Sequence, residues 1–127
     1  MSIKSPQTLV QEALKEVKTI SPEEALEKHK NNQCNLIDIR DSVELQNQGS
    51  IENALNISRG LLEFMLHPDS PYVEQNGLDL NKEIVLFCAA GGRSALAAKT
   101  LKEMGFEKVS HVDGGFGTMQ LSGFKII

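Results

Sequence analysis

One cysteine, followed by a loop of small residues, carries the clearest chemistry in this sequence. Cys88 comes directly after the apolar run 84–87 and directly before Ala89-Ala90-Gly91-Gly92-Arg93-Ser94, which leads into an alanine-rich helix. The start of a helix favours negative charge, because its backbone N–H groups are unpaired and its dipole is positive there. The sequence therefore favours the thiolate of Cys88, which is the nucleophilic form of a cysteine.

The composition of the loop suits a cradle of amide groups around one anion. Ala89 and Ala90 are small enough to let the chain curl, and Gly91 and Gly92 accept the positive φ angles that a semicircular loop requires. A buried structural cysteine beside a simple turn is the alternative. The spacing Cys-x-x-Gly-x-Arg-Ser between a strand and a helix favours the site.

Arg93 is the cation nearest to Cys88 in the sequence. Its guanidinium group can bind the anionic end of a substrate, or it can tie the loop to a neighbouring carboxylate. Both interpretations stay open at the level of the sequence.

Further charged residues follow two other predicted strands. Asp38 and Arg40 lie at the carboxyl end of an apolar run, where α/β proteins place their sites. Arg40 and Glu44 are one helical turn apart, which predicts an ion pair that braces the site more than a ligand. Arg59 follows the short strand that ends at Ile57, and it either faces the mouth of the site, where it would attract anions, or lies solvated on the surface.

Strands and helices alternate along the chain and predict an α/β fold, with a parallel sheet covered by helices on both faces. The predicted strands are residues 17–20, 36–39, 54–57, 84–87 and 109–112, and the predicted helices are residues 6–17, 22–29, 42–48, 61–66 and 95–104. Residues 67–77 form a surface excursion that we expect to be mobile, and Gly114-Gly115 turns the chain toward a last segment, 118–123.

Length and composition predict one domain with ordinary globular character. The chain has 127 residues, 24% of them charged, and a net charge of −4. We divide it into an N-terminal amphipathic helix extension, residues 1–17, and a domain over residues 18–127. The acidic balance disfavours nucleic acid as a partner, and the lack of a long apolar run or a signal sequence predicts a cytoplasmic protein without membrane contact.

The remaining cysteine and the histidines give weaker signals. Cys34 shares no metal-binding spacing with Cys88, and we interpret it as an ordinary thiol, with a resolving role for Cys88 as the alternative. His29, His67 and His111 are widely separated and are interpreted as surface or core residues. The sequence therefore predicts neither a metal site nor an organic cofactor.

From about Val17 to Phe116 the chain resembles the rhodanese homology domain. The resemblance rests on the order and spacing of several short motifs together, which are Asp38-Ile39-Arg40 with Glu44, Gly49-Ser50-Ile51, Asn53-Ala54, Asn56-Ile57, Cys88 to Ser94, Ala97-Ala98, Leu101, Gly105-Phe106, Val109 and Gly114-Gly115. It implies a five-stranded, mainly parallel sheet and a sulfurtransferase that moves a sulfane sulfur from thiosulfate or a similar anionic donor through a persulfide on Cys88. Cyanide, a thiol or a protein would accept the sulfur.

Two alternatives to such an enzyme follow from the same residues. Phosphatases and arsenate reductases related to this family use a Cys-x5-Arg loop, whereas Cys88 and Arg93 form the shorter Cys-x4-Arg, which suits one sulfur atom better than a phosphoryl group. A sulfur-relay or protein-binding module with little turnover of small molecules is the second alternative. The N-terminal helix would suit protein docking or a homodimer contact.

Overall fold

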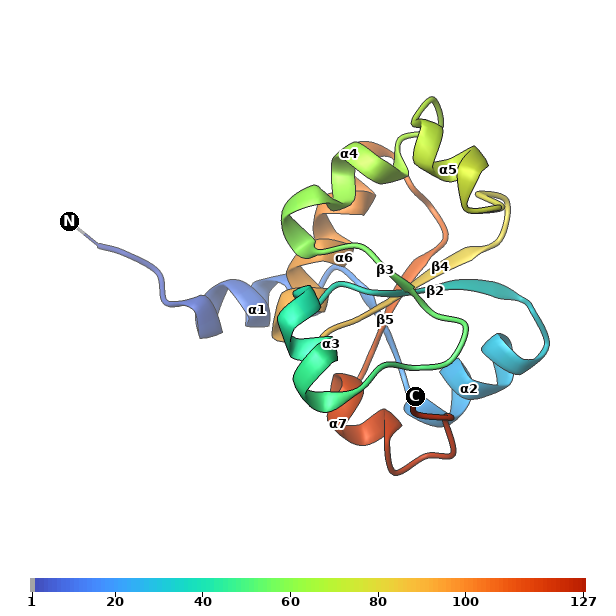
Figure 1. Ribbon diagram of the computed structural model, residues 1–127. Coiled ribbons are helices and arrows are strands. Elements are labelled where there is room, and N and C mark those ends of the chain that lie inside the picture. Colours follow the sequence, from blue (N-terminus) through green and yellow to red (C-terminus); the bar gives the residue numbers. More distant parts are fainter. Residues whose placement is uncertain (1) are drawn as a thin grey trace.

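Five parallel strands form the centre of the protein, which a computed structural model describes over residues 2–127 (Figure 1). The strand order is β1-β5-β4-β2-β3, and every neighbouring pair is parallel. The elements in chain order are α1 (Pro6–Leu14), β1 (Lys18–Ile20), α2 (Pro22–Lys30), β2 (Cys34–Asp38), α3 (Ser42–Gln48), β3 (Leu55–Asn56), the 3-10 turn η1 (Arg59–Leu61), α4 (Leu62–Leu66), α5 (Pro71–Gln75), β4 (Glu83–Phe87), α6 (Gly92–Met104), β5 (Val109–Val112) and α7 (Gly115–Met119). The predicted α/β fold with a five-stranded sheet is confirmed.

Strand β4 is the central strand, and its last four residues are buried. An unbroken apolar run is typical of a strand that is covered on both faces. In register, Asp38 at the end of β2 lies beside Phe87 at the end of β4. The parallel arrangement therefore brings the charged segment after β2 and the Cys88 loop after β4 to the same edge of the sheet.

Each face of the sheet has its own apolar core. One core joins the sheet to α4 and α6 through Leu62, Leu66 and Leu101, and the other joins it to α2 and α7 through Ala25 and Met119. In Figure 1, α4 and α6 lie above the sheet, and α2 and α7 lie below it. The helices thus fix the Cys88 loop from above, through α6, and from below, through α7.

Local signals explain where the first helices begin. Ser5 and Ser21 cap α1 and α2 by accepting the backbone N–H of the residue three positions on, and a proline follows each cap. Helix α1 ends at Leu14, three residues before the predicted end, and it packs against α6. Val10 of α1 lies 3.6 Å from the position that a Cβ on Gly92 would take, so α1 flanks the start of α6.

Three elements differ from the sequence-based prediction. Helix α6 begins at Gly92, three residues earlier than predicted, which places Arg93 and Ser94 in its first turn. The predicted surface excursion at 67–77 contains the helix α5. The segment after Gly114 forms the helix α7, which was not predicted. Within residues 2–127, no helix combines the length and the apolar character needed to span a membrane.

Candidate active site

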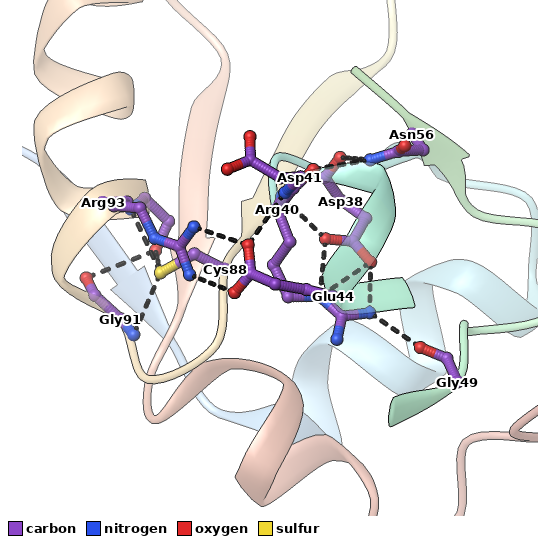
Figure 2. Close-up of polar contacts among 10 residues, drawn as sticks. Asp38, Arg40, Asp41, Glu44, Gly49, Asn56, Cys88, Gly91 and Arg93 are labelled. Carbon is purple, nitrogen blue, oxygen red and sulfur yellow. Dashed lines mark hydrogen bonds and ion pairs between the residues drawn. The ribbon is translucent and has the colours of Figure 1, made fainter. Parts of the chain in front are cut away.

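Two backbone N–H groups of the loop donate hydrogen bonds to the sulfur of Cys88. The backbone N–H of Gly91 donates to Sγ at 3.1 Å (Figure 2). The backbone N–H of Ser94 donates to the same atom at 3.3 Å. Cys88 is only 1% exposed. Two N–H dipoles aimed at one nearly buried atom stabilise negative charge on that atom.

The start of α6 explains why these amides are free to bind sulfur. Gly91 is the N-cap with φ of +110°, a conformation that suits glycine, and its carbonyl accepts the first helical bond from Ala95 at 3.2 Å. Ser94 is the third helical residue, so its N–H has no partner inside the helix. The sulfur of Cys88 takes the place that a capping side chain would otherwise fill.

Helix α7 holds the other side of the loop. The N–H of Phe116 donates to the carbonyl of Cys88 at 2.8 Å, and the N–H of Gly117 donates to the carbonyl of Ala89 at 3.2 Å. Gly115 has φ of +59°, and a Cβ at this position would lie 2.4 Å from the carbonyl oxygen of Cys88. The close approach of α7 to the loop therefore requires glycine at position 115.

Arg93 forms a bidentate ion pair with Glu44. Its Nη1 and Nη2 donate to the two carboxylate oxygens at 2.9 and 2.8 Å. The hydrogen bonds from Arg93 lower the pKa of Glu44 to about 2, and the same bonds raise the pKa of Arg93. Of the two interpretations of Arg93, the structure shows the tie to a carboxylate, and the side chain is still 40% exposed.

The predicted ion pair between Arg40 and Glu44 is wrong. Arg40 binds Asp38, with Nε at 3.0 Å from Oδ1 and Nη2 at 2.7 Å from Oδ2, and its Nη2 also donates to the carbonyl of Gly49 at 3.0 Å. Burial explains why Arg40 binds Asp38 in place of Glu44. Arg40 is 0% exposed and Asp38 is 2% exposed, so each charge needs a partner inside the protein.

Arg40 also connects the strand β2 to α7. Its guanidinium carbon lies 3.9 Å from the centre of the Phe116 ring, an aromatic contact that favours the cation. Phe116 in turn donates its N–H to the carbonyl of Cys88. Asp38 and Arg40 thus support the loop through Phe116 of α7 and do not contact the sulfur.

Arg59 lies among groups that neutralise it. Its guanidinium donates to Glu63 at 2.9 Å and to the hydroxyl of Thr100 at 3.1 Å. These contacts join η1 to α4 and α6. They favour a structural role over the capture of anions.

The second cysteine lies at the opposite end of the sheet. Cys34 begins β2, where it pairs in register with Glu83, and the length of β4 places it about 16 Å from Cys88. Burial raises the pKa of Cys34 to about 11. Cys34 lines a cavity of about 580 Å³ that includes His29 and no residue of the Cys88 loop.

The sequence-based prediction assigned no role at the loop to two residues that the structure places against it. Phe116 binds the loop through its N–H, and His111 of β5 lies with Nδ1 at 2.9 Å from the Ser94 hydroxyl. His111 is 1% exposed, as expected for a core histidine, but it is within reach of the loop. Only the tertiary structure reveals its partner, since 17 residues separate it from Ser94. Among residues 2–127, no cluster of three histidine, cysteine or acidic side chains is placed to hold a metal ion.

Comparison with protein families gives one match that spans most of the chain. The model of the Rhodanese-like domain matches residues 21–120. This range includes the Cys88 loop, the Asp38 to Glu44 segment and α7.

Two solved structures have a similar fold over most of this chain. A protein of unknown function from Rhodopseudomonas palustris, described as a possible tyrosine phosphatase, is 35% identical with a TM-score of 0.86 over 100% of this chain and 98% of that chain. The polysulfide-sulfur transferase homodimer from Wolinella succinogenes is 33% identical with a TM-score of 0.73 over 95% of this chain and 85% of that chain.

A curated relative is a much longer protein. The tRNA uridine(34) hydroxylase from Chlamydia abortus is 35% identical over 105 residues, which cover 77% of this chain and 29% of the relative. The chain therefore spans less than a third of the length of that protein.

Proposed function

The chain belongs to the family of Rhodanese-like domains, and we propose that it is a sulfurtransferase that carries a sulfane sulfur on Cys88 as a persulfide. The observation that supports this most directly is the convergence of the Gly91 and Ser94 amides on Sγ at 3.1 and 3.3 Å. An anion resides on sulfur before and after the transfer, so both halves of the reaction gain from the same donors.

In the first half, the thiolate of Cys88 attacks the outer sulfur of a donor such as thiosulfate. The Sγ–S bond forms while the S–S bond of thiosulfate breaks, and sulfite leaves with the electron pair. The new outer sulfur projects about 2 Å beyond Sγ, toward any acceptor that reaches the loop. Because Cys88 is 1% exposed, the site favours small donors over bulky ones.

In the second half, an acceptor such as cyanide or a thiolate attacks that outer sulfur. The acceptor–sulfur bond forms, the Sγ–S bond breaks, and the electron pair returns to Sγ as the thiolate. With cyanide the product is thiocyanate. The polysulfide-sulfur transferase from W. succinogenes supports polysulfide as a further donor to be tested.

A phosphatase reaction is less well supported by this site. The loop from Cys88 to Arg93 has four intervening residues, and the guanidinium of Arg93 already binds both oxygens of Glu44. A phosphoryl group needs several donors around three oxygens, whereas the amides here converge on the cysteine sulfur. The phosphatase description of the R. palustris protein is tested by including a phosphate ester among the assays.

A relay module is the second candidate function, and the packing of α1 bears on it. Helix α1 flanks the loop through Val10 and Gly92, and Leu9 and Leu14 are each 43% exposed on its outer side. A protein acceptor that binds these side chains would lie beside the loop. In a relay, sulfur loads onto Cys88 but leaves slowly when cyanide is the acceptor.

The test is the intact mass of the reduced protein after incubation with thiosulfate or polysulfide. We expect a gain of about 32 Da, one sulfur, in the wild type and in Cys34→Ser, and no gain in Cys88→Ser. Rapid release of thiocyanate on addition of cyanide supports the enzyme, and slow release supports the relay. The absence of added sulfur from both donors in the wild type would exclude the proposal, and hydrolysis of p-nitrophenyl phosphate that depends on Cys88 would favour the phosphatase.

A further inference from the structure

A line of hydrogen-bonding side chains runs from Cys88 across the sheet to the edge strand β1. Sγ of Cys88 lies 3.5 Å from Oγ of Ser94, and that hydroxyl lies 2.9 Å from Nδ1 of His111. On the other side of the ring, Nε2 of His111 lies 2.9 Å from Oγ1 of Thr19. Ser94 and His111 are 0% and 1% exposed, whereas Thr19 is exposed.

The burial of His111 favours the neutral form of its ring. Burial lowers the pKa of His111, while the charge of Asp113 acts weakly in the opposite direction. A neutral imidazole carries one N–H, which is on either Nδ1 or Nε2. Thr19 accepts or donates with equal ease, so it fits both tautomers.

Ser94 has one hydroxyl proton and three acceptors within reach. These are Sγ of Cys88, Nδ1 of His111 and the carbonyl of Gly91, which lies 3.3 Å from Oγ. If Nδ1 of His111 lacks a proton, it takes the hydroxyl proton of Ser94 and the sulfur loses a donor. If Nδ1 carries the proton, it donates to Oγ, and the hydroxyl proton is left to the Gly91 carbonyl or the sulfur. A thiolate is charged and a carbonyl is not, so the hydroxyl proton turns toward the sulfur once Cys88 is ionised.

We propose that His111 is a positioning residue, which in its Nδ1–H tautomer directs the hydroxyl of Ser94 at the sulfur of Cys88. The sulfur then has three donors, the two backbone amides and this hydroxyl. The proposal rests on the proposed function, because the anion that the hydroxyl serves is the thiolate and then the persulfide.

Loss of the thiol proton along the same line produces this tautomer. The proton on Sγ moves to Oγ of Ser94, the former hydroxyl proton moves to Nδ1 of His111, and the proton on Nε2 moves to Oγ1 of Thr19, whose own proton leaves to water. One proton is released in total. Cys88 ends as a thiolate, Ser94 donates to it, and His111 carries its proton on Nδ1.

Asparagine and glutamine at position 111 separate the two ring nitrogens. The amide N–H of asparagine reaches the place of Nδ1 and can still donate to Ser94, whereas that of glutamine reaches the place of Nε2, near Thr19. We expect His111→Asn to keep the rate of alkylation of Cys88 by iodoacetamide within about threefold of wild type at pH 7. We expect His111→Gln to lower it about tenfold or more, with the two rates converging at pH 10, because the lost bond is one to an anion.

The alkylation is measured in a Cys34→Ser background, with urea unfolding of each variant to show that it is folded. The assay involves no transferred sulfur, so its outcome is independent of whether the protein transfers sulfur. The second measurement uses wild-type protein labelled with ¹⁵N, in which the ring nitrogen shifts of His111 report its tautomer. The Nδ1–H form in the thiolate protein supports the proposal; the Nε2–H form, or equal alkylation rates for the two variants, would overturn it.

Discussion

Replacing Gly115 with alanine tests whether α7 positions the Cys88 loop. A Cβ at this position would lie 2.4 Å from the carbonyl oxygen of Cys88 and 2.9 Å from the carbonyl carbon of Ala89. Both neighbours are backbone atoms, so no side chain can rotate away. An ordinary contact begins at 3.4 Å, and the loop and α7 must therefore separate by about 1 Å.

The expected loss has two parts. The φ of +59° at Gly115 is unfavourable for alanine by about 1 kcal/mol. The separation also breaks the bond from the N–H of Phe116 to the carbonyl of Cys88, now 2.8 Å, which contributes about 1 kcal/mol. We expect the free energy of unfolding to fall by about 2 kcal/mol, measured by urea titration.

The same shift displaces Sγ from its donors. A hydrogen bond to a charged group is worth about 1.5 to 3 kcal/mol, so weakening one of the two amide bonds lowers the alkylation rate of Cys88 at pH 7 about tenfold or more. The alkylation rate is measured with iodoacetamide in the absence of urea, where the variant is folded. Sulfur uptake is expected to fall in parallel.

Gly77→Ala is the matched control. Gly77 has a similar φ of +64°, but nothing lies within 4 Å of the position of its Cβ. This variant is expected to lose about 1 kcal/mol of stability through φ alone, with the alkylation of Cys88 unchanged. If Gly115→Ala matched Gly77→Ala in both stability and alkylation, the coupling of α7 to the loop would be refuted.

Three further predictions use the titrating groups. Glu44 has a pKa of about 2 in the folded protein against 4.5 ordinarily, so the stability that it contributes is lost as the pH falls from 4.5 to 2. In Glu44→Gln the urea midpoint should therefore depend less on pH over that range. A wild-type curve as flat as that of the variant would contradict this. The pKa of His111 is lowered in the folded protein, so below about pH 6.5 the unfolded chain binds a proton at His111 more readily than the folded protein does. The stability of the folded protein therefore falls as the solution is acidified. His111→Asn should reduce the change in the urea midpoint between pH 7.5 and 5.5. Cys34, with a pKa of about 11, should react far more slowly than Cys88 with iodoacetamide at pH 7.5, as peptide mass mapping would show; equal labelling would be the contrary result.

The sequence predicted the features that arise from neighbours along the chain. The apolar run before Cys88, the small residues after it and the alanine-rich segment beyond specify a strand, a loop and a helix in order. Because a loop that opens a helix leaves its amides unpaired, the donors to sulfur followed from the same local pattern. The structure identifies the two amides that reach the sulfur, those of Gly91 and Ser94.

The ion pairs could not be predicted in this way. The spacing of Arg40 and Glu44 favoured a local pair, but Arg93, 49 residues away, takes Glu44, and Arg40 turns to Asp38. The choice depends on burial, because Arg40 lies fully inside the protein and its neighbour there is Asp38. Burial is set by the packing of the whole sheet, so it cannot be predicted from a few neighbouring residues in the sequence.

Helix α7 was missed for a related reason. Its sequence, Gly-Phe-Gly-Thr-Met, contains two glycines and has little intrinsic preference for a helix. Its stability comes from contacts distant in sequence, since Phe116 and Met119 are buried against the sheet and its first amides bind the loop. Gly115, which weakens the helix, is also the residue that lets it approach the loop.

The loop is held on two sides by different kinds of hydrogen bond, and this bears on the proposed transfer of sulfur. The side that faces the sulfur consists of donors that stabilise an anion, and the side that faces α7 consists of carbonyls bound at 2.8 and 3.2 Å. Binding the carbonyls of Cys88 and Ala89 to α7 fixes the loop backbone without using the amides that serve the sulfur. Arg40 stabilises α7 through the Phe116 ring at 3.9 Å, so a buried cation supports the loop indirectly, through α7. Arg93 is paired with Glu44, and the groups in direct contact with the sulfur are the amides of Gly91 and Ser94 and the Ser94 hydroxyl. Such dipoles hold an anion in place while leaving it free to react.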